Sequence, residues 1–425
     1  MNTAPAGGRS ALLPAAGIPL LYFGFAHLCL SGAFGVLVAA PALPGPFFLH
    51  PRMVAVVHLV TLGWISGSIL GAFYIVGPLA LRVPLRPGTG DGVAFGAFVA
   101  GVAGMVSHFW IGEYHGMVWS ALLVVVPVVH VGVRAWIGLR HAPVPWPVKL
   151  HVGLAFGNMV AASGLGIIVG MNRMLGWFPW SALSAAYAHA HLAAIGWGVM
   201  MVVGLSYRLM PMILPAAMPA GTSIAASAVL LESGVLVLVV ALLAGSSWTV
   251  LGALLVLGGL VSFVAHVRGM LKQRRPPAVA IPRPDWATWQ THVAFIWLLA
   301  AAGTGFTLSL PIQHSRALAL GWCYGTLGLV GFLAQIVIGM QGRLLPLHAW
   351  YRSFEAGGLQ PPARAAHARA SPRLAKWIFV AWTLGVPLLA CGLSFGIESA
   401  NVAGAALLLV GVILNAAQGI RVATS

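Results

Sequence analysis

Charged side chains are scarce in this sequence, and acidic ones are the scarcest. Only 7% of the 425 residues are charged, and just six residues are Asp or Glu. Soluble domains carry about 25% charged residues, so the composition excludes an ordinary soluble protein. With 60% hydrophobic residues, the sequence instead predicts an all-α polytopic membrane protein.

Cysteine is almost absent as well. Cys29, Cys323 and Cys391 lie in separate apolar stretches without Cys-x-x-Cys spacing. This pattern indicates neither a disulfide framework nor a zinc site, and we expect the three thiols to be small packing residues. Because no Cys-x-x-Cys-His motif occurs, any covalently attached haem would belong to another subunit.

Positive charge is in excess, with a net charge of +16, but it does not indicate nucleic-acid binding. The basic residues fall in short segments between apolar stretches, where they set membrane orientation. With a cytoplasmic N-terminus, all of the 22 Lys and Arg residues except Arg52, Arg173 and Arg316 lie on the inner side. We therefore predict a multi-pass protein of the bacterial inner membrane, in contact with lipid, with both termini in the cytoplasm.

Long apolar stretches account for most of the chain. Each of twelve is long enough for a spanning helix, and glycine and proline are tolerated inside such helices. A basic stretch at 351–376 is typical of a flexible cytoplasmic loop. The twelve stretches lie near residues 14–40, 53–81, 92–112, 116–137, 149–171, 183–213, 222–244, 248–270, 289–311, 318–346, 375–396 and 400–420.

An internal repeat relates three of these stretches. The second contains His58, Gly63, Trp64, Gly71, Tyr74 and Pro78, and the sixth contains the same residue types 133 positions later, from His191 to Pro211. The tenth carries a weaker copy in which Thr326 stands in the histidine position. The repeat predicts one transmembrane domain over 1–425, built from three four-helix units near 14–140, 147–272 and 286–421 around a pseudo-threefold axis.

Histidines collect in the outer half of the predicted bundle. His58 lies about 10 Å below the outer boundary by helical rise, and the repeat gives His191 the same depth. The i, i+2 spacing rotates His189 and His191 by roughly 200°, so that one can face the second helix and the other the tenth. His108, His115 and Glu113 are expected in the same layer. Because polar groups are costly inside a membrane, this clustering favours a haem or metal site.

The predicted outer side has only three basic residues, and each precedes one of the three repeat-related helices: Arg52, Arg173 and Arg316. Haem propionates that point outward would need such partners. The alternative is that the arginines extend to lipid head groups.

The stretch 189–197 reads His-Ala-His-Leu, three further residues, then Gly-Trp. It resembles the haem-ligand helix of the haem-copper oxidase subunit I superfamily, especially its cbb3-type members, whose architecture is also twelve helices in three units. Segments 58–63 and 342–346 are similar to the NnrS-type haem- and copper-containing membrane proteins. The resemblance implies b-type haem as cofactor, His189 and His191 as candidate ligands, and copper or non-haem iron as a second metal.

Two arrangements of the site are open. In the first, His58 and one of the pair His189 and His191 hold a six-coordinate haem. In the second, one of that pair holds a five-coordinate haem, while His58, His108 and either His115 or Glu113 hold copper or iron opposite it.

The resemblance further implies electron transfer, or the binding or reduction of a diatomic gas such as nitric oxide or oxygen, by an oxidoreductase similar to a terminal oxidase or a nitric oxide reductase. An electron-donor subunit or a cytochrome c would be its partner. A secondary transporter, for which internal repeats are also typical, and a haem- or copper-handling protein without redox catalysis are the alternatives.

Overall fold

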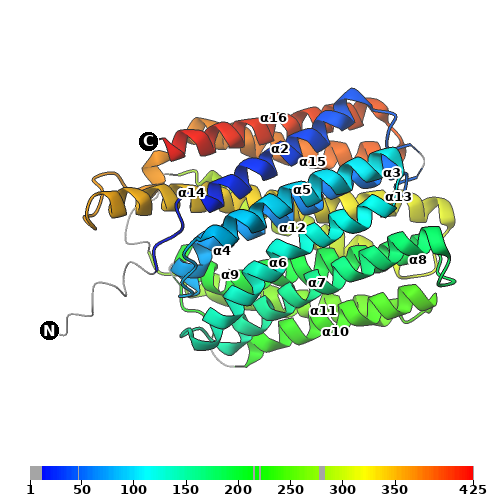
Figure 1. Ribbon diagram of the computed structural model, residues 1–425, viewed down its shortest axis with the longest axis horizontal. Helices are drawn as coiled ribbons and strands as arrows, with labels where there is room; N and C mark the ends of the chain where they lie inside the picture. The colour runs from blue at the N-terminus through cyan, green and yellow to red at the C-terminus, as the bar shows by residue number, and fades with distance from the viewer. Residues whose placement is uncertain (1–11, 46, 214–215, 220–221, 277–282, 425) are drawn as a thin grey trace.

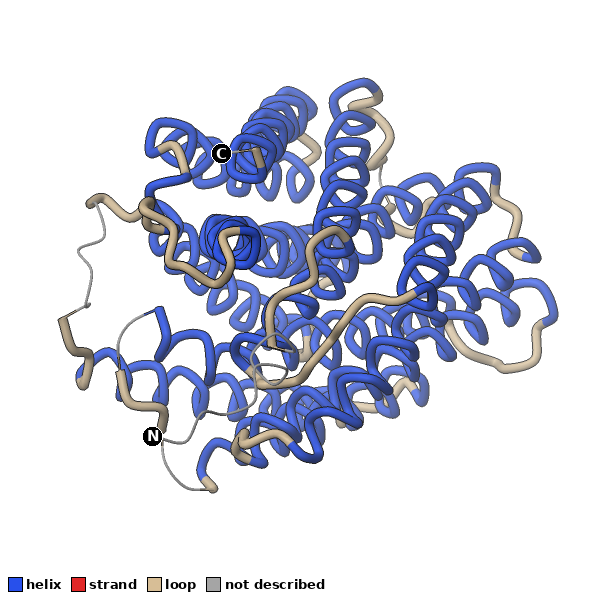
Figure 2. Tube along the Cα trace, turned by 60° about the vertical axis from the view of Figure 1, so that its left-hand side comes forward, coloured by secondary structure: helices blue, strands red, loops and turns tan. Residues whose placement is uncertain are grey.

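The computed structural model describes residues 12–45, 47–213, 216–219, 222–276 and 283–424 (Figure 1). Within these ranges the chain is helical with short connections and contains no strand (Figure 2). Twelve of the described helices are long and apolar enough to cross a membrane, which confirms the predicted all-α polytopic fold. Their ends differ from the predicted ones by a few residues.

The elements follow one another in an up-and-down order. They are α2 (Ile18–Ala39), α3 (Pro51–His58), η1 (Leu59–Ser66), α4 (Gly67–Ala80), α5 (Thr89–Ile111), α6 (His115–His141), α7 (Trp146–Leu175), α8 (Ala182–His191), η2 (Leu192–Val199), α9 (Met200–Ile213), α10 (Ser223–Ala244), α11 (Thr249–Lys272), α12 (Trp286–Leu308), α13 (His314–Gly325), η3 (Thr326–Ala334), α14 (Gln335–Ala356), η4 (Ala366–Arg369), α15 (Pro372–Phe395) and α16 (Glu398–Ala423).

The helices of the three predicted four-helix units make the same contacts in each unit. In each unit the first helix packs against the second, as α2 does on α4, α7 on α9 and α12 on α14, while the third and fourth form a tight hairpin, α5 with α6, α10 with α11 and α15 with α16. Each hairpin turns at a glycine with positive φ: Gly112 (75°), Gly245 (63°) and Gly396 (67°). Glycine adopts this left-handed conformation without a Cβ penalty and commonly ends helices in this way.

The second helix of each unit lies at the centre of the bundle. Each changes from α- to π-helical hydrogen bonding for one segment, η1, η2 and η3, and these three segments contact one another. The large side chains at their matched positions, Trp64, Trp197 and Phe332, are fully buried. The pseudo-threefold axis therefore passes between the π segments. The π-helix is rare in proteins, and where it occurs it is often found at a functional site.

The repeated glycines of the π segments make room for the first helix of their own unit. A Cβ at Gly196 would lie 2.9 Å from the side chain of Asn158 on α7, and one at Gly331 would lie 2.9 Å from Trp297 on α12. A Cβ at Gly63 would lie closer still to its neighbour, the Cβ of Cys29 on α2. The repeat thus records a packing requirement that recurs in all three units.

The link between α14 and α15 and the burial of the cysteines differ from the sequence prediction. The non-helical link between α14 and α15 is shorter than 351–376, because α14 continues to Ala356 and α15 begins at Pro372. Arg369 within it is buried and donates to Ser353 Oγ. Of the cysteines, only Cys29 is fully buried, whereas Cys391 is exposed on the surface of the bundle.

The two ends of the bundle differ in the side chains that they carry. We call the end at which α3, α8 and α13 begin the histidine end, and the end at which α4, α9 and α14 finish the basic end; they lie on the right and left of Figure 1.

Candidate functional site

His58 and His189 face each other near the histidine end. Each lies seven residues into its helix, α3 from Pro51 and α8 from Ala182, which is a depth of about 10 Å. The centres of the two imidazole rings are 6.4 Å apart and the ring planes differ by 16°. Two units of the repeat thus contribute one imidazole each to the same place.

Backbone carbonyls fix both rings. His58 Nδ1 lies 2.8 Å from the carbonyl oxygen of Val54, and His189 Nδ1 lies 3.0 Å from that of Ala162 on α7. Because a carbonyl only accepts, each Nδ1 carries the proton and each Nε2 carries a lone pair. Among the described residues, neither Nε2 has a hydrogen-bond partner.

The distance between the two ring centres matches that of a bis-imidazole metal site. A metal held in line between two imidazole nitrogens, with bonds of about 2 Å, separates the ring centres by roughly 6 Å. A backbone carbonyl on the second ring nitrogen is the usual support for a metal-ligating histidine. Gly166 leaves room for the ring of His189, because a Cβ there would lie 2.8 Å from its Cε1 atom.

The two imidazoles provide the protein ligands that the first of the two arrangements requires. No group of three or more His, Cys, Asp or Glu side chains that could hold a metal occurs among the described residues. A haem brings four nitrogen donors of its own, so two histidines complete its iron. The residues present therefore fit the first of the two arrangements that the sequence left open.

His191 faces the other way, as its spacing from His189 predicts. Its Nδ1 donates to the carbonyl of Tyr187 at 2.7 Å, and its Nε2 accepts from the hydroxyl of Tyr324 at 3.2 Å. Tyr324 belongs to α13, so the pair of histidines on α8 joins its helix to both other central helices. Tyr324 was not predicted as a site residue, although it stands 135 residues after His189, close to the offset that relates these helices.

The side chain from α5 that contacts His58 is Phe109. The two ring centres are 4.8 Å apart, whereas the neighbouring His108 points toward α6 and packs at Gly116. Phe109 therefore covers one face of the His58 ring and shields it from the lipid side of α5.

His108, Glu113 and His115 form a separate cluster at the turn between α5 and α6. Glu113 lies 2.8 Å from His108 Nδ1 and 3.3 Å from His115 Nδ1. Its carboxylate also accepts the backbone N–H groups of Gly116 and His115, and the Gly116 bond is the main cause that lowers the pKa of Glu113. The contacts of this cluster cap the start of α6 and do not include His58.

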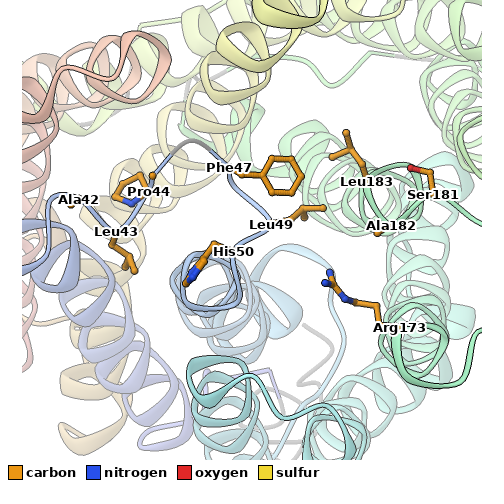
Figure 3. Close-up of a pocket in the computed structure, with 11 residues that line it drawn as sticks. Ala42, Leu43, Pro44, Phe47, Leu49, His50, Arg173, Ser181, Ala182 and Leu183 are labelled. Atoms are coloured by element: carbon orange, nitrogen blue, oxygen red, sulfur yellow. The ribbon is translucent and has the colours of Figure 1, made fainter.

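The cavity at the histidine end lies over the gap between α3 and α8. It has a volume of about 710 Å³, and its walls come from the α2–α3 connection, the end of α7 and the start of α8. Phe47, Leu49 and Leu183 make it largely apolar, while His50 and Arg173 are its charged or titratable side chains (Figure 3). The His58 and His189 rings lie about two helical turns below it.

The three outer arginines are not equivalent. Arg173 borders the cavity, with its guanidinium carbon 5.4 Å from the ring centre of Tyr114. Arg52 is exposed and stacks on Trp110 at 5.3 Å. Arg316 is exposed near the start of α13 and does not line the cavity. Only Arg173 is placed to meet an acidic group that enters between α3 and α8.

No protein-family model matches the chain, and no curated protein is significantly similar to it. The resemblance to haem-copper oxidases and NnrS-type proteins therefore stays a prediction from the motifs.

Proposed function

We propose that the protein binds b-type haem within the membrane and that His58 and His189 would hold its iron. The observation that carries the proposal is the facing pair of imidazoles, 6.4 Å apart, whose Nδ1 atoms are both held by backbone carbonyls. The motif resemblance at 189–197 and 58–63 supports the same cofactor.

The haem would supply one-electron redox chemistry, and the chain would supply position and environment. The carbonyls of Val54 and Ala162 orient the two rings and increase their basicity as ligands. Arg173 would pair with a propionate, since a guanidinium binds a carboxylate strongly and directionally. Phe109 on His58 limits access of water to the ligand.

A haem held by both His58 and His189 would supply electron transfer or redox sensing in preference to catalysis at the iron. Binding or reduction of nitric oxide or oxygen would require one histidine to leave, or copper or non-haem iron elsewhere. An oxidoreductase in the bacterial inner membrane, with cytoplasmic termini and an electron-donor subunit or cytochrome c as partner, is the setting in which such a haem would act.

An absorption spectrum of the purified full chain, reduced minus oxidised, tests the proposal. We expect sharp low-spin b-type bands and about one haem per chain, lost in both His58→Ala and His189→Ala. His191→Ala is the matched control. It also removes an imidazole from α8, but the Nε2 atom of His191 already has a partner in the hydroxyl of Tyr324. Haem-free protein, or bands that survive in His58→Ala, would exclude the bis-histidine site.

Carbon monoxide and metal analysis decide between the two arrangements. A six-coordinate haem leaves the reduced spectrum unchanged when carbon monoxide is added. A shifted band, together with copper or non-haem iron in the purified protein, would favour a five-coordinate haem and a second metal. Absence of both haem and metal would favour a secondary transporter.

A further inference from the structure

A second cavity lies at the opposite end of the same central helices. It occupies about 140 Å³ between α4, α9 and α14 and reaches outward between α11 and α12. Its walls are mainly apolar, from residues such as Ile69, Leu205 and Phe295, and its polar side chains include Gln341 and Arg343. None of these residues takes part in the histidine site.

Three polar side-chain atoms of residues that line this cavity have no hydrogen-bond partner among the described residues. They are Nε2 of Gln341, Nε of Arg343 and the hydroxyl oxygen of Ser68. Gln341 is only 2% exposed, and its Oε1 accepts from Asn415 at 2.7 Å, which fixes the orientation of the amide. A buried donor without a partner costs about 1–3 kcal/mol, so an acceptor from outside the chain would be stabilised here.

The charge of the cavity is already balanced. Arg343 pairs with Asp285 and also donates to Thr288 Oγ1 at 3.1 Å. A carboxylate or phosphate that entered would meet Asp285 as well as Arg343, whereas a neutral carbonyl oxygen would accept from a free N–H donor without this repulsion. The chemistry of the site therefore favours a neutral acceptor over an anion.

The size and position of the cavity constrain the rest of the ligand. Its volume is below the roughly 300–1,000 Å³ of sites that enclose a whole small molecule, so it accommodates a head group only. Val267 and Leu271 on α11 and Phe295 on α12 line it and are partly exposed, and His292 beside them is exposed. An apolar tail could leave between these two helices toward the lipid.

We propose that this cavity binds the carbonyl head group of a lipid-soluble molecule of the quinone class, held by Gln341 and Arg343, with its tail between α11 and α12. A ring with two carbonyl oxygens and an apolar tail satisfies the free donors, the neutral charge and the apolar walls together. The inference does not depend on haem at the histidine site.

Equilibrium binding to the purified full chain tests the proposal, with a decyl-substituted benzoquinone as the probe and decanoate as the anionic comparison. We expect saturable binding of the quinone, weakened roughly tenfold in Gln341→Leu because one hydrogen bond and its buried donor are lost. Arg343→Lys keeps a cation beside Asp285 but removes the Nε donor, and we expect a similar loss.

Gln290→Leu is the matched control. Gln290 is a buried glutamine with an unpartnered Nε2, but it does not line the cavity. Wild-type affinity in this variant, and in His58→Ala, would support the assignment. The proposal is overturned if the quinone does not saturate, if decanoate binds more tightly, or if Gln341→Leu and Arg343→Lys bind it like the wild type.

Discussion

Trp197 on η2 donates its indole N–H to the hydroxyl oxygen of Ser66 on η1, over a distance of 3.1 Å. Trp64, at the equivalent position of the first unit, donates in turn to the backbone carbonyl of Ala334 on η3, at 3.2 Å. At the third equivalent position stands Phe332, which has no donor. The central helices are therefore linked in one rotational sense, from the second unit to the first and from the first to the third.

Loss of one of these links is predicted to destabilise the bundle. In Trp197→Phe the indole N–H is removed and Ser66 is left without its donor, so we expect a loss of about 1–2 kcal/mol in the free energy of unfolding. Thermal unfolding of the purified protein measures it. Trp136→Phe is the control, because Trp136 is half exposed on the surface of α6. Equal melting temperatures for the two variants would contradict the role of the link.

The repeated π-segment glycines, Gly63, Gly196 and Gly331, are predicted to tolerate no side chain. Gly196→Ala brings a Cβ to 2.9 Å from Asn158, and overpacking of this kind costs about 1–3 kcal/mol. Gly164→Ala on α7 is the control, since no neighbouring atom lies within 4 Å of its added Cβ, and it should be neutral or slightly stabilising. A chemical or thermal unfolding series of both variants checks the prediction, which fails if Gly196→Ala is as stable as Gly164→Ala.

Tyr324→Phe separates the roles of the two histidines on α8. The change removes the hydroxyl that donates to His191 Nε2, and we expect a stability loss of about 1 kcal/mol. The haem content and absorption bands should stay those of the wild type, because His189 makes no contact with Tyr324 in the structure. Loss of the haem bands in Tyr324→Phe would instead assign a ligand role to His191.

Arg173→Gln is predicted to weaken haem retention. If Arg173 pairs with a propionate, loss of this charge-assisted bond should lower haem affinity roughly tenfold. Haem transfer to an excess of apo-myoglobin gives the dissociation rate. Arg52→Gln removes an outer arginine that stacks on Trp110 instead of lining the cavity, and we expect it to retain haem normally. Equal rates in both variants would remove Arg173 from the site.

The sequence predicted the membrane fold well because two of its signals do not depend on how the side chains pack. Apolar stretches of spanning length predict helices whatever their packing, and the 133-residue offset from His58 to His191 predicts the three units. The offset also identified the central helices, which carry the repeated glycine followed by Trp64, Trp197 or Phe332.

Other features depend on side-chain direction, which the sequence does not specify. Hydropathy does not distinguish i→i+4 from i→i+5 bonding, so η1, η2 and η3 were not predicted. The sequence left both His189 and His191 as candidates for the residue that faces His58. The carbonyl of Ala162, which orients His189, belongs to another helix, so the sequence did not indicate it. Tyr324 was missed because an aromatic residue at helical spacing is typical of packing.

The three π segments have a consequence for the histidines that precede them. A π turn holds one residue more than an α turn, and one residue corresponds to about 100° of rotation in an α-helix. If η1 were an α-helix of the same length, His58 would therefore be rotated by about this angle about its helix axis, away from His189. The π segments thus determine the direction in which each imidazole points around its helix axis, and the number of residues before it determines its depth in the bundle.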